Sequence, residues 1–188
     1  MAWKLAQSPK ITELLIAPGN AGTAEVGTNV NIGVDDHAEI VQFATDEKFD
    51  LVVVAPDQPI VDGLCDHLRS AGITTFGPSA AAARIEGSKI WSDGIMTKYE
   101  IPTADSVAFS DSVMAIEYGR SKPAGSLVVK ADGLAAGKGV ILPDNEDDLD
   151  SAIVGMLDQG AFGESSSSIL LAERMSGFEA SVFAFVDG

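Results

Sequence analysis

The sequence predicts an α/β protein that consists of two α/β units joined by a helical segment. Short apolar runs alternate along the chain with longer amphipathic segments, as strands alternate with helices in this fold class. The run at residues 51–55 (LVVVA) is apolar throughout, which is typical of a parallel strand covered on both faces. The alternation stops after residue 78, where small residues dominate, and resumes after residue 105. The pattern therefore indicates two separate α/β units.

The first unit has the order strand–helix–strand–helix–strand, which indicates a doubly wound sheet. Residues 2–7 have the pattern of the last turns of a helix, which Ser8 and Pro9 end. A doubly wound unit normally starts with a strand that feeds its first helix. We therefore expect that this strand and its turn are missing, and that the N-terminus is truncated or begins at the wrong start. We expect strands at residues 13–17, 51–55 and 73–76 and helices at residues 36–47 and 60–71.

A linker and a second unit follow. Residues 78–100 are helical in pattern and rich in small residues, which predicts a linker with a helical hairpin, closed by Ile101 and Pro102. The dipeptide Asp187-Gly188 is typical of a hairpin turn, so we expect the last strand to lack a neighbour that the sequence was about to provide. For the second unit we expect strands at residues 106–109, 127–131, 140–142, 168–173 and 178–186, helices at 111–119 and 147–159, and a glycine-rich loop at 132–139.

Composition and charge exclude several classes of protein. The formal net charge of −16 argues against DNA or RNA as a partner, although it leaves room for a nucleotide. The acidic run at residues 144–150 has the pattern of a solvated helix start. The apolar runs are far shorter than the roughly 20 residues of a membrane helix, and no charged-then-apolar leader opens the chain. One cysteine, Cys65, excludes an internal disulfide framework. We expect a cytoplasmic protein.

The glycine-rich loop carries the strongest chemical signal. It differs from a P-loop in three ways: the spacing from Gly133 to Gly137 is one residue short, Gly139 replaces the Ser or Thr that would hold magnesium, and a strand follows instead of a helix. A strand–loop–strand with three glycines predicts a flexible hairpin tip that folds over a triphosphate and offers N–H groups, while Lys130 reaches in from the preceding strand. The alternative is an ordinary hairpin with a mobile tip.

Two further features point to a nucleotide. A strand ends near Glu173, and Glu179 opens the next predicted strand, where a carboxylate could hold ribose hydroxyls. Lys89 follows Glu86 at the start of a helix and could approach a phosphate from the other wall of a cleft. Taken singly, both are equally compatible with solvated surface charges. His37 and His67 fall on predicted helices away from these motifs, and with no clustered partner we interpret them as structural.

Together these residues resemble the ATP-grasp superfamily, and within it the phosphoribosylamine–glycine ligase family. The resemblance covers essentially the whole chain, and its last motif is highly specific. The matching segments, in the family's order, are APGNAGTA at residues 17–24, FGPS at 76–79, IEGSK at 85–89, IPTA at 101–104 and VKADGLAAGKGV at 129–140.

The resemblance implies the domain organisation. Residues 1–86 correspond to a Rossmann-like (pre-ATP-grasp) domain without its first strand. Residues 87–104 correspond to a helical linker and the start of the ATP-grasp domain, and residues 105–188 to its small, ATP-binding lobe, incomplete at the C-terminus. In the family the first domain helps to bind a phosphorylated sugar, and a later section supplies the magnesium ligands. We therefore expect those ligands beyond Gly188.

The resemblance also implies roles for individual residues. Lys89 and Lys130 correspond to phosphate-contacting lysines, and Gly137, Lys138 and Gly139 to the loop over the phosphates. The segment Ala172, Glu173, Arg174 and Met175 corresponds to the adenine-contacting crossover, and Glu179 to the ribose-binding acid. Gly19 and Asn20 lie in a loop near the sugar phosphate, and Asp57 falls at a possible substrate position. Two departures stand out: Ala172 replaces the first of two acids, and Ala55-Pro56-Asp57 replaces Gly-Pro-Glu, which weakens any role for Asp57.

The activity that the resemblance implies is ATP-dependent ligation of glycine to phosphoribosylamine, with Mg²⁺ and through glycyl phosphate. No side chain in this segment is expected to act as nucleophile or general base. Because the magnesium-binding section is absent, we expect this chain alone to be inactive. Two alternatives stay open: another ATP-grasp ligase or carboxylase, and a nucleotide-binding module without catalysis.

Overall fold

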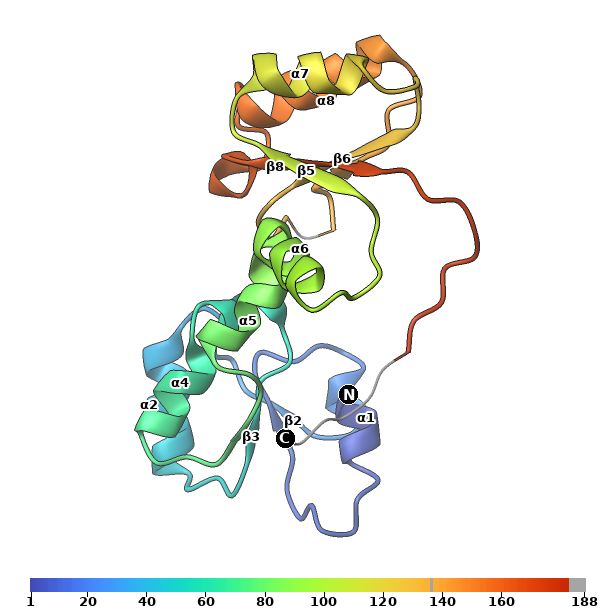
Figure 1. The fold of residues 1–188 in the computed structure, drawn as a ribbon. Helices are drawn as coiled ribbons and strands as arrows, with labels where there is room; N and C mark the ends of the chain where they lie inside the picture. The colour runs from blue at the N-terminus through green and yellow to red at the C-terminus, as the bar shows by residue number, and fades with distance from the viewer. Residues whose placement is uncertain (136, 183–188) are drawn as a thin grey trace. The chain divides into compact units, whose positions relative to one another are not determined.

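In the computed structural model, residues 1–135 and 137–182 are described, and they form two compact units (Figure 1). The first unit runs from Met1 to Gly87 and the second begins at Ser88. No helix among the described residues is long and apolar enough to cross a membrane.

The first unit contains two pairs of short parallel strands. Strand β1 (Leu15–Ile16) pairs with β2 (Thr28–Asn29), and β3 (Val52–Val53) pairs with β4 (Thr75–Phe76). The predicted parallel pairing is confirmed, but the described residues form two separate two-stranded sheets. The helices of this unit are α1 (Ala2–Leu5), α2 (His37–Asp46), α3 (Asp57–Val61), α4 (Leu64–Ser70) and α5 (Ala80–Gly87), with a 3₁₀ turn, η1, at Thr23–Glu25.

The predicted helix at residues 60–71 was wrong in one respect, since the structure divides this region between α3 and α4. Gly63 stands between the two helices with φ 89°, a left-handed conformation that glycine adopts at little cost and that interrupts a helix. Behind this break, Leu64, Cys65 and Leu68 of α4 are buried in the core of the unit. The core also includes Ala44, Val54 and Ile73.

The second unit is a four-stranded antiparallel sheet of order β5-β8-β6-β7. Helices α7 and α8 lie on one face of this sheet, and α6 lies on the other side, where it contacts β8 (Figure 1). The strands are β5 (Ser106–Phe109), β6 (Leu127–Ala131), β7 (Val140–Ile141) and β8 (Ile169–Glu173); the helices are α6 (Lys89–Lys98), α7 (Ser112–Arg120) and α8 (Glu146–Leu157), with a 3₁₀ turn, η2, at Gly163–Ser166.

Side-chain caps fix where the helices of the second unit start. Asp111 accepts a hydrogen bond from the Met114 N–H at 2.9 Å and begins α7, and Asn145 accepts one from the Asp148 N–H at 2.9 Å and begins α8. The first turn of α8 carries three acidic residues, a favourable arrangement at the positive end of a helix. The prediction that residues 144–150 form a helix start is confirmed.

The predicted strand at residues 178–186 was wrong over its described part. Residues 178–182 form no strand, and Phe178 and Val182 are exposed, at 105% and 94%. A strand is stabilised by backbone hydrogen bonds to a neighbour, and no described residue pairs with this segment. The rest of the predicted strand, residues 183–186, lies outside the described residues.

Candidate functional site

The glycine-rich loop joins two strands of the second unit, as predicted. The Ala131 N–H donates to the Gly139 carbonyl at 2.8 Å, and Lys130 lies opposite Val140 in the register of β6 and β7. Residues 132–139 therefore form a hairpin loop that leads into a strand, which agrees with the sequence argument against a P-loop.

The base of this loop is fixed by hydrogen bonds to residues near η2. The Gly133 N–H donates to the Ser165 carbonyl at 3.0 Å, and the Ser165 hydroxyl donates to the Leu134 carbonyl at 2.6 Å. The Asp132 N–H donates to the Ser168 carbonyl at 3.0 Å. A Cβ on Gly133 would lie 2.9 Å from the Ser165 Cα, so only glycine fits this approach without a shift.

The tip of the loop is open by contrast. Gly137 has φ 76°, and a Cβ built on it would meet no atom within 4 Å. Lys138 is exposed, and its N–H donates to the Ala135 carbonyl at 2.9 Å. Gly139 is buried where the loop closes, and a Cβ there would lie 2.7 Å from the Ala135 Cβ. The loop thus combines a fixed base with a Gly137 position that has no close steric neighbour among the described residues.

Lys89 lies against the base of the loop. Its N–H donates to the Asp132 carbonyl at 3.0 Å, and its Nζ donates to the Gly133 carbonyl at 3.0 Å and lies 3.4 Å from the Asp132 carbonyl oxygen. The structure therefore joins two motifs that the sequence shows separately, although 43 residues separate Lys89 from Asp132.

Lys130 projects from the sheet face opposite α7 and α8. Its neighbours Val129 and Ala131 belong to the core cluster that packs with these helices, and side chains alternate between faces along a strand. Lys130 is half-buried, and none of the described residues forms an ion pair with it. Because α6 also lies on this side of the sheet, Lys89 and Lys130 stand on the same side (Figure 1).

The predicted adenine-contacting crossover begins at the end of β8. Ala172 is buried within the sheet. The Glu173 N–H donates to the Asp105 carbonyl and the Arg174 N–H to the Ser126 carbonyl, both at 2.8 Å. The Arg174 guanidinium forms an ion pair with Asp144 at 3.0 Å. These two backbone donors and this side chain are therefore engaged within the protein, whereas the Met175 side chain is 71% exposed.

Glu179, the predicted ribose-binding acid, is exposed and lies in the segment that forms no strand. The expectation that a strand aims its carboxylate was therefore wrong, because the alternation that would orient the side chain is absent. Its predicted contact with a ribose is a separate matter and stays a prediction.

The predicted sugar-phosphate residues lie in the first unit. The Asn20 Oδ1 accepts from the Thr23 N–H at 3.0 Å, and the Asn29 Nδ2 donates to the Asn20 carbonyl at 2.8 Å, so the loop is held by the side chains of Asn20 itself and of Asn29 in β2. A Cβ on Gly19 would overlap the Asn29 side chain. Asp57 is exposed in the first turn of α3.

Two residues outside the motifs also have defined surroundings. The rings of His37 and His67 meet edge to face with centroids 5.5 Å apart, which corrects the expectation that neither histidine has a partner. Cys65 is buried, and burial raises the pKa of its thiol.

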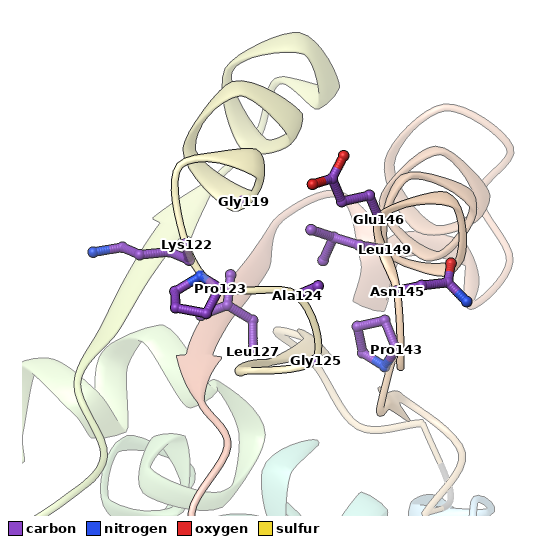
Figure 2. A pocket seen from close by; sticks show the side chains of 10 residues that line it. All are labelled: Gly119, Lys122, Pro123, Ala124, Gly125, Leu127, Pro143, Asn145, Glu146 and Leu149. Carbon is purple, nitrogen blue, oxygen red and sulfur yellow. The ribbon is translucent and has the colours of Figure 1, made fainter.

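A shallow hollow in the second unit contains none of the predicted site residues. Figure 2 shows it between the end of α7, the start of β6 and the start of α8. Its lining residues are Gly119, Lys122, Pro123, Ala124, Gly125, Leu127, Pro143, Asn145, Glu146 and Leu149.

Sequence reasoning missed three residues that organise the site. Ser88, Asp132 and Ser165 connect the start of α6, the loop and η2 through hydrogen bonds. A serine directly before a helix is a capping signal, and it could have identified Ser88. Nothing local in the sequence indicates that Asp132 or Ser165 reaches a distant element.

The second unit thus has a hairpin loop with a lysine on its incoming strand and a second lysine docked at its base, on a sheet backed by two helices, and the family comparison assigns this unit to the ATP-grasp class. Two family models match the chain: "Phosphoribosylglycinamide synthetase, N domain" over residues 1–86 and "Phosphoribosylglycinamide synthetase, ATP-grasp (A) domain" over residues 87–188. The chain belongs to the phosphoribosylglycinamide synthetase family. ATP-grasp enzymes in general use ATP and a divalent metal ion.

Curated relatives and solved structures agree with this family. The chain is 45% identical over 190 residues to phosphoribosylamine–glycine ligase of Escherichia coli O157:H7 and 45% identical over 188 residues to that of Agrobacterium fabrum. It is covered completely in both cases and spans 44% of each relative's length. The crystal structure of phosphoribosylamine–glycine ligase from Thermotoga maritima matches the chain with 25% sequence identity and a TM-score of 0.74. The match covers 94% of this chain and 41% of the Thermotoga chain. D-alanine–D-alanine ligase from Bacillus anthracis matches the chain with 20% sequence identity and a TM-score of 0.62, which shows a shared fold. The match covers 86% of this chain and 50% of the Bacillus chain.

Proposed function

We propose that this chain forms the phosphorylated-sugar and ATP-binding parts of a ligase that joins glycine to phosphoribosylamine. The observation that carries the proposal is the contact of Lys89 with the base of the glycine-rich loop, on the same side of the sheet as Lys130. Two lysines at a loop of this kind suit a triphosphate, because ammonium groups and backbone N–H groups both stabilise phosphate charge. Family membership over the whole chain supports the choice of reaction.

The proposed reaction has two steps. A glycine carboxylate oxygen attacks the γ-phosphorus of ATP, the bond to the bridging oxygen breaks, and ADP leaves glycyl phosphate behind. The amine of phosphoribosylamine then attacks the carbonyl carbon, loses a proton, and displaces phosphate to give glycinamide ribonucleotide. Phosphoryl transfer needs positioning and charge stabilisation more than covalent help from the protein. Lys89, Lys130 and the loop of Gly137, Lys138 and Gly139 serve this purpose.

The remaining assignments complete the proposed site. The segment from Ala172 to Met175 contacts adenine, and the Met175 side chain, 71% exposed, is open to a ligand. Glu179 binds the ribose, and Gly19, Asn20 and Asp57 lie toward the sugar phosphate. A magnesium ion neutralises phosphate charge in such reactions. In the described part of the chain no group of three or more His, Cys, Asp or Glu side chains is arranged to hold a metal ion.

We further propose a cytoplasmic location and small-molecule partners only. The single cysteine and the metabolic relatives support a reducing compartment, and the net charge of −16 opposes binding to a nucleic acid.

Nucleotide binding by the 188-residue chain tests the phosphate site. Lys130→Ala should weaken ATP binding by roughly 1.5–3 kcal/mol, because it removes a charge-assisted hydrogen bond, and should leave adenosine binding unchanged. Lys98→Ala is the matched control, since it removes the same charge from the far end of α6. Isothermal titration calorimetry with ATP and adenosine gives both affinities. An equal loss for the two ligands would mean that Lys130 acts through the fold.

The chemistry is tested in a ligase of the relatives' full length that carries these residues. Hydroxylamine intercepts acyl phosphates, so ATP, glycine and hydroxylamine should yield glycine hydroxamate and ADP. Replacing glycine by bicarbonate or D-alanine tests the alternative of another ATP-grasp ligase or carboxylase. If either supports ADP formation better than glycine does, the proposed substrate is wrong. ATP binding without any turnover would favour a nucleotide-binding module.

A further inference from the structure

The carboxylate of Asp132 binds the first turn of α6. Its Oδ1 accepts from the Ile90 N–H at 2.7 Å, and the Ser88 hydroxyl lies 2.9 Å from Oδ1 and 3.1 Å from Oδ2. The Ser88 oxygen in turn accepts from the Trp91 N–H at 3.0 Å. Asp132 and Ser88 together therefore satisfy two of the N–H groups that the start of a helix leaves without an intrahelical partner.

The backbone of Asp132 binds the same turn. Its carbonyl oxygen accepts from the Lys89 N–H at 3.0 Å and lies 3.4 Å from the Lys89 Nζ. Asp132 thus contacts three consecutive residues, the cap residue Ser88 and the first two residues of α6. Its own N–H donates to the Ser168 carbonyl. Gly133 also links the two segments, because its carbonyl accepts from the Lys89 Nζ and its N–H donates to the Ser165 carbonyl. Among the described residues of the loop, however, only Asp132 accepts from backbone N–H groups at the start of α6.

The charge of Asp132 matters for where a phosphate can bind. A helix N-terminus attracts anions through its N–H groups and dipole, and at α6 a carboxylate already occupies that place. A triphosphate near the loop must therefore be held by the Lys89 side chain and not by the N-terminal N–H groups of α6. The Lys89 Nζ donates to the Gly133 carbonyl, an acceptor that a phosphate oxygen can replace.

We propose that Asp132 is a positioning residue, which fixes the start of α6 on the glycine-rich loop so that Lys89 faces the phosphates. This role rests on the proposed ATP-binding function. Asp132 itself contacts no phosphate, since its carboxylate is turned toward α6 and would repel one. Its effect on nucleotide affinity passes through Lys89.

A double-mutant cycle on the 188-residue chain tests this role. Asp132→Ala should weaken ATP binding about tenfold, the size typical of residues that act on a ligand through a neighbour, and leave adenosine binding unchanged. In a Lys89→Ala background the same change should have little further effect, because the group it positions is gone. Asp132→Asn should lose less than Asp132→Ala, since an amide oxygen can still accept from the Ile90 N–H.

Asp111 supplies the matched control. It caps α7 through the Met114 N–H, in the same unit and with no hydrogen bond to the glycine-rich loop among the described residues. Asp111→Ala should lower the thermal midpoint, as loss of a cap does, and leave ATP affinity unchanged. Additive losses for Asp132→Ala and Lys89→Ala, or an equal loss of ATP affinity in Asp111→Ala, would overturn the positioning role.

A measurement without nucleotide separates this proposal from the proposed function. Competitive amine labelling, read by mass spectrometry, gives the reactivity of Lys89 relative to Lys98 on the same helix. Asp132→Ala should raise this ratio, because Lys89 loses its fixed position. If the parent chain binds no ATP, the proposed function fails while a raised ratio still supports the contact. An unchanged ratio overturns the positioning role whether or not ATP binds.

Discussion

Replacing Gly133 by alanine tests whether the base of the glycine-rich loop is rigid. The added Cβ would lie 2.7 Å from the Ser165 Oγ and 2.9 Å from both the Cβ and the Cα of Ser165. The Cα belongs to the backbone, so a change of side-chain rotamer at Ser165 cannot relieve the overlap. The loop or the η2 segment must move, and the overlap directly threatens the hydrogen bonds from Gly133 N–H to Ser165 and from Ser165 to Leu134.

The cost follows from these contacts. Overpacking of this kind typically costs about 1–3 kcal/mol. Loss of two hydrogen bonds of about 0.5–1.5 kcal/mol each brings the loss of unfolding free energy to roughly 2–6 kcal/mol. For a chain of this size that corresponds to a thermal midpoint lower by about 4–24 °C.

Two other glycines provide controls for the assay, which is differential scanning calorimetry of each variant. Gly155 lies within α8 and a Cβ there meets no atom within 4 Å, so Gly155→Ala should be neutral or stabilise by up to about 1 kcal/mol. Gly137→Ala meets no atom either, and only its φ of 76° opposes the change, at about 1–2 kcal/mol. If Gly133→Ala leaves the midpoint within the range of Gly155→Ala, the base of the loop is not rigid and our account of it is wrong.

Two further predictions concern the loop tip and the core of the first unit. In a ligase of the relatives' full length, Gly137→Val should lower turnover far more than it lowers the thermal midpoint, and ATP should protect the loop less from protease. The reason is that the tip has little packing to lose but must approach phosphate closely. Full turnover with a large drop in the midpoint would rule out a lid. Burial raises the pKa of the Cys65 thiol above its ordinary value of 9.0, so the unfolded chain releases this proton first. The free energy of unfolding should therefore fall as pH rises above about 9, and Cys65→Ala should lose this part of the pH dependence in urea titrations at pH 8 to 10, a result that identical slopes in both proteins would contradict.

The second unit was predicted closely because its local signals are strong. The strands Ser106–Phe109 and Leu127–Ala131 were located to the residue, and each is a mostly apolar run followed by a polar turn. The segment at 178–186 has the same local pattern over part of its length, yet its described residues form no strand. Strand formation depends on a partner, and local sequence does not report whether one is present.

The first unit shows the complementary failure. Strand β2 at Thr28–Asn29 was missed because it is short, exposed on both residues and not apolar. It forms because the Thr28 N–H donates to the Leu14 carbonyl at 2.9 Å and the Val30 N–H to the Ile16 carbonyl at 2.9 Å, contacts that a distant segment supplies. The contact between Lys89 and Asp132 was likewise beyond local reasoning, since it joins residues 43 positions apart.

The three glycines of the loop show how far residue type alone can be interpreted. From the sequence, Gly133, Gly137 and Gly139 all indicate backbone freedom. In the structure, Gly133 and Gly139 are required because a Cβ would collide with Ser165 or Ala135, which makes them marks of close packing. Only Gly137 stands in open space with a left-handed backbone. A loop that closes over a triphosphate needs both kinds: a base that keeps its register with Lys89 and Lys130, and a tip that moves while they stay in place. The positions of the three glycines in the sequence therefore mark the loop. Only the atoms around each glycine in the structure show whether it allows a bend, as at Gly137, or a close contact, as at Gly133 and Gly139.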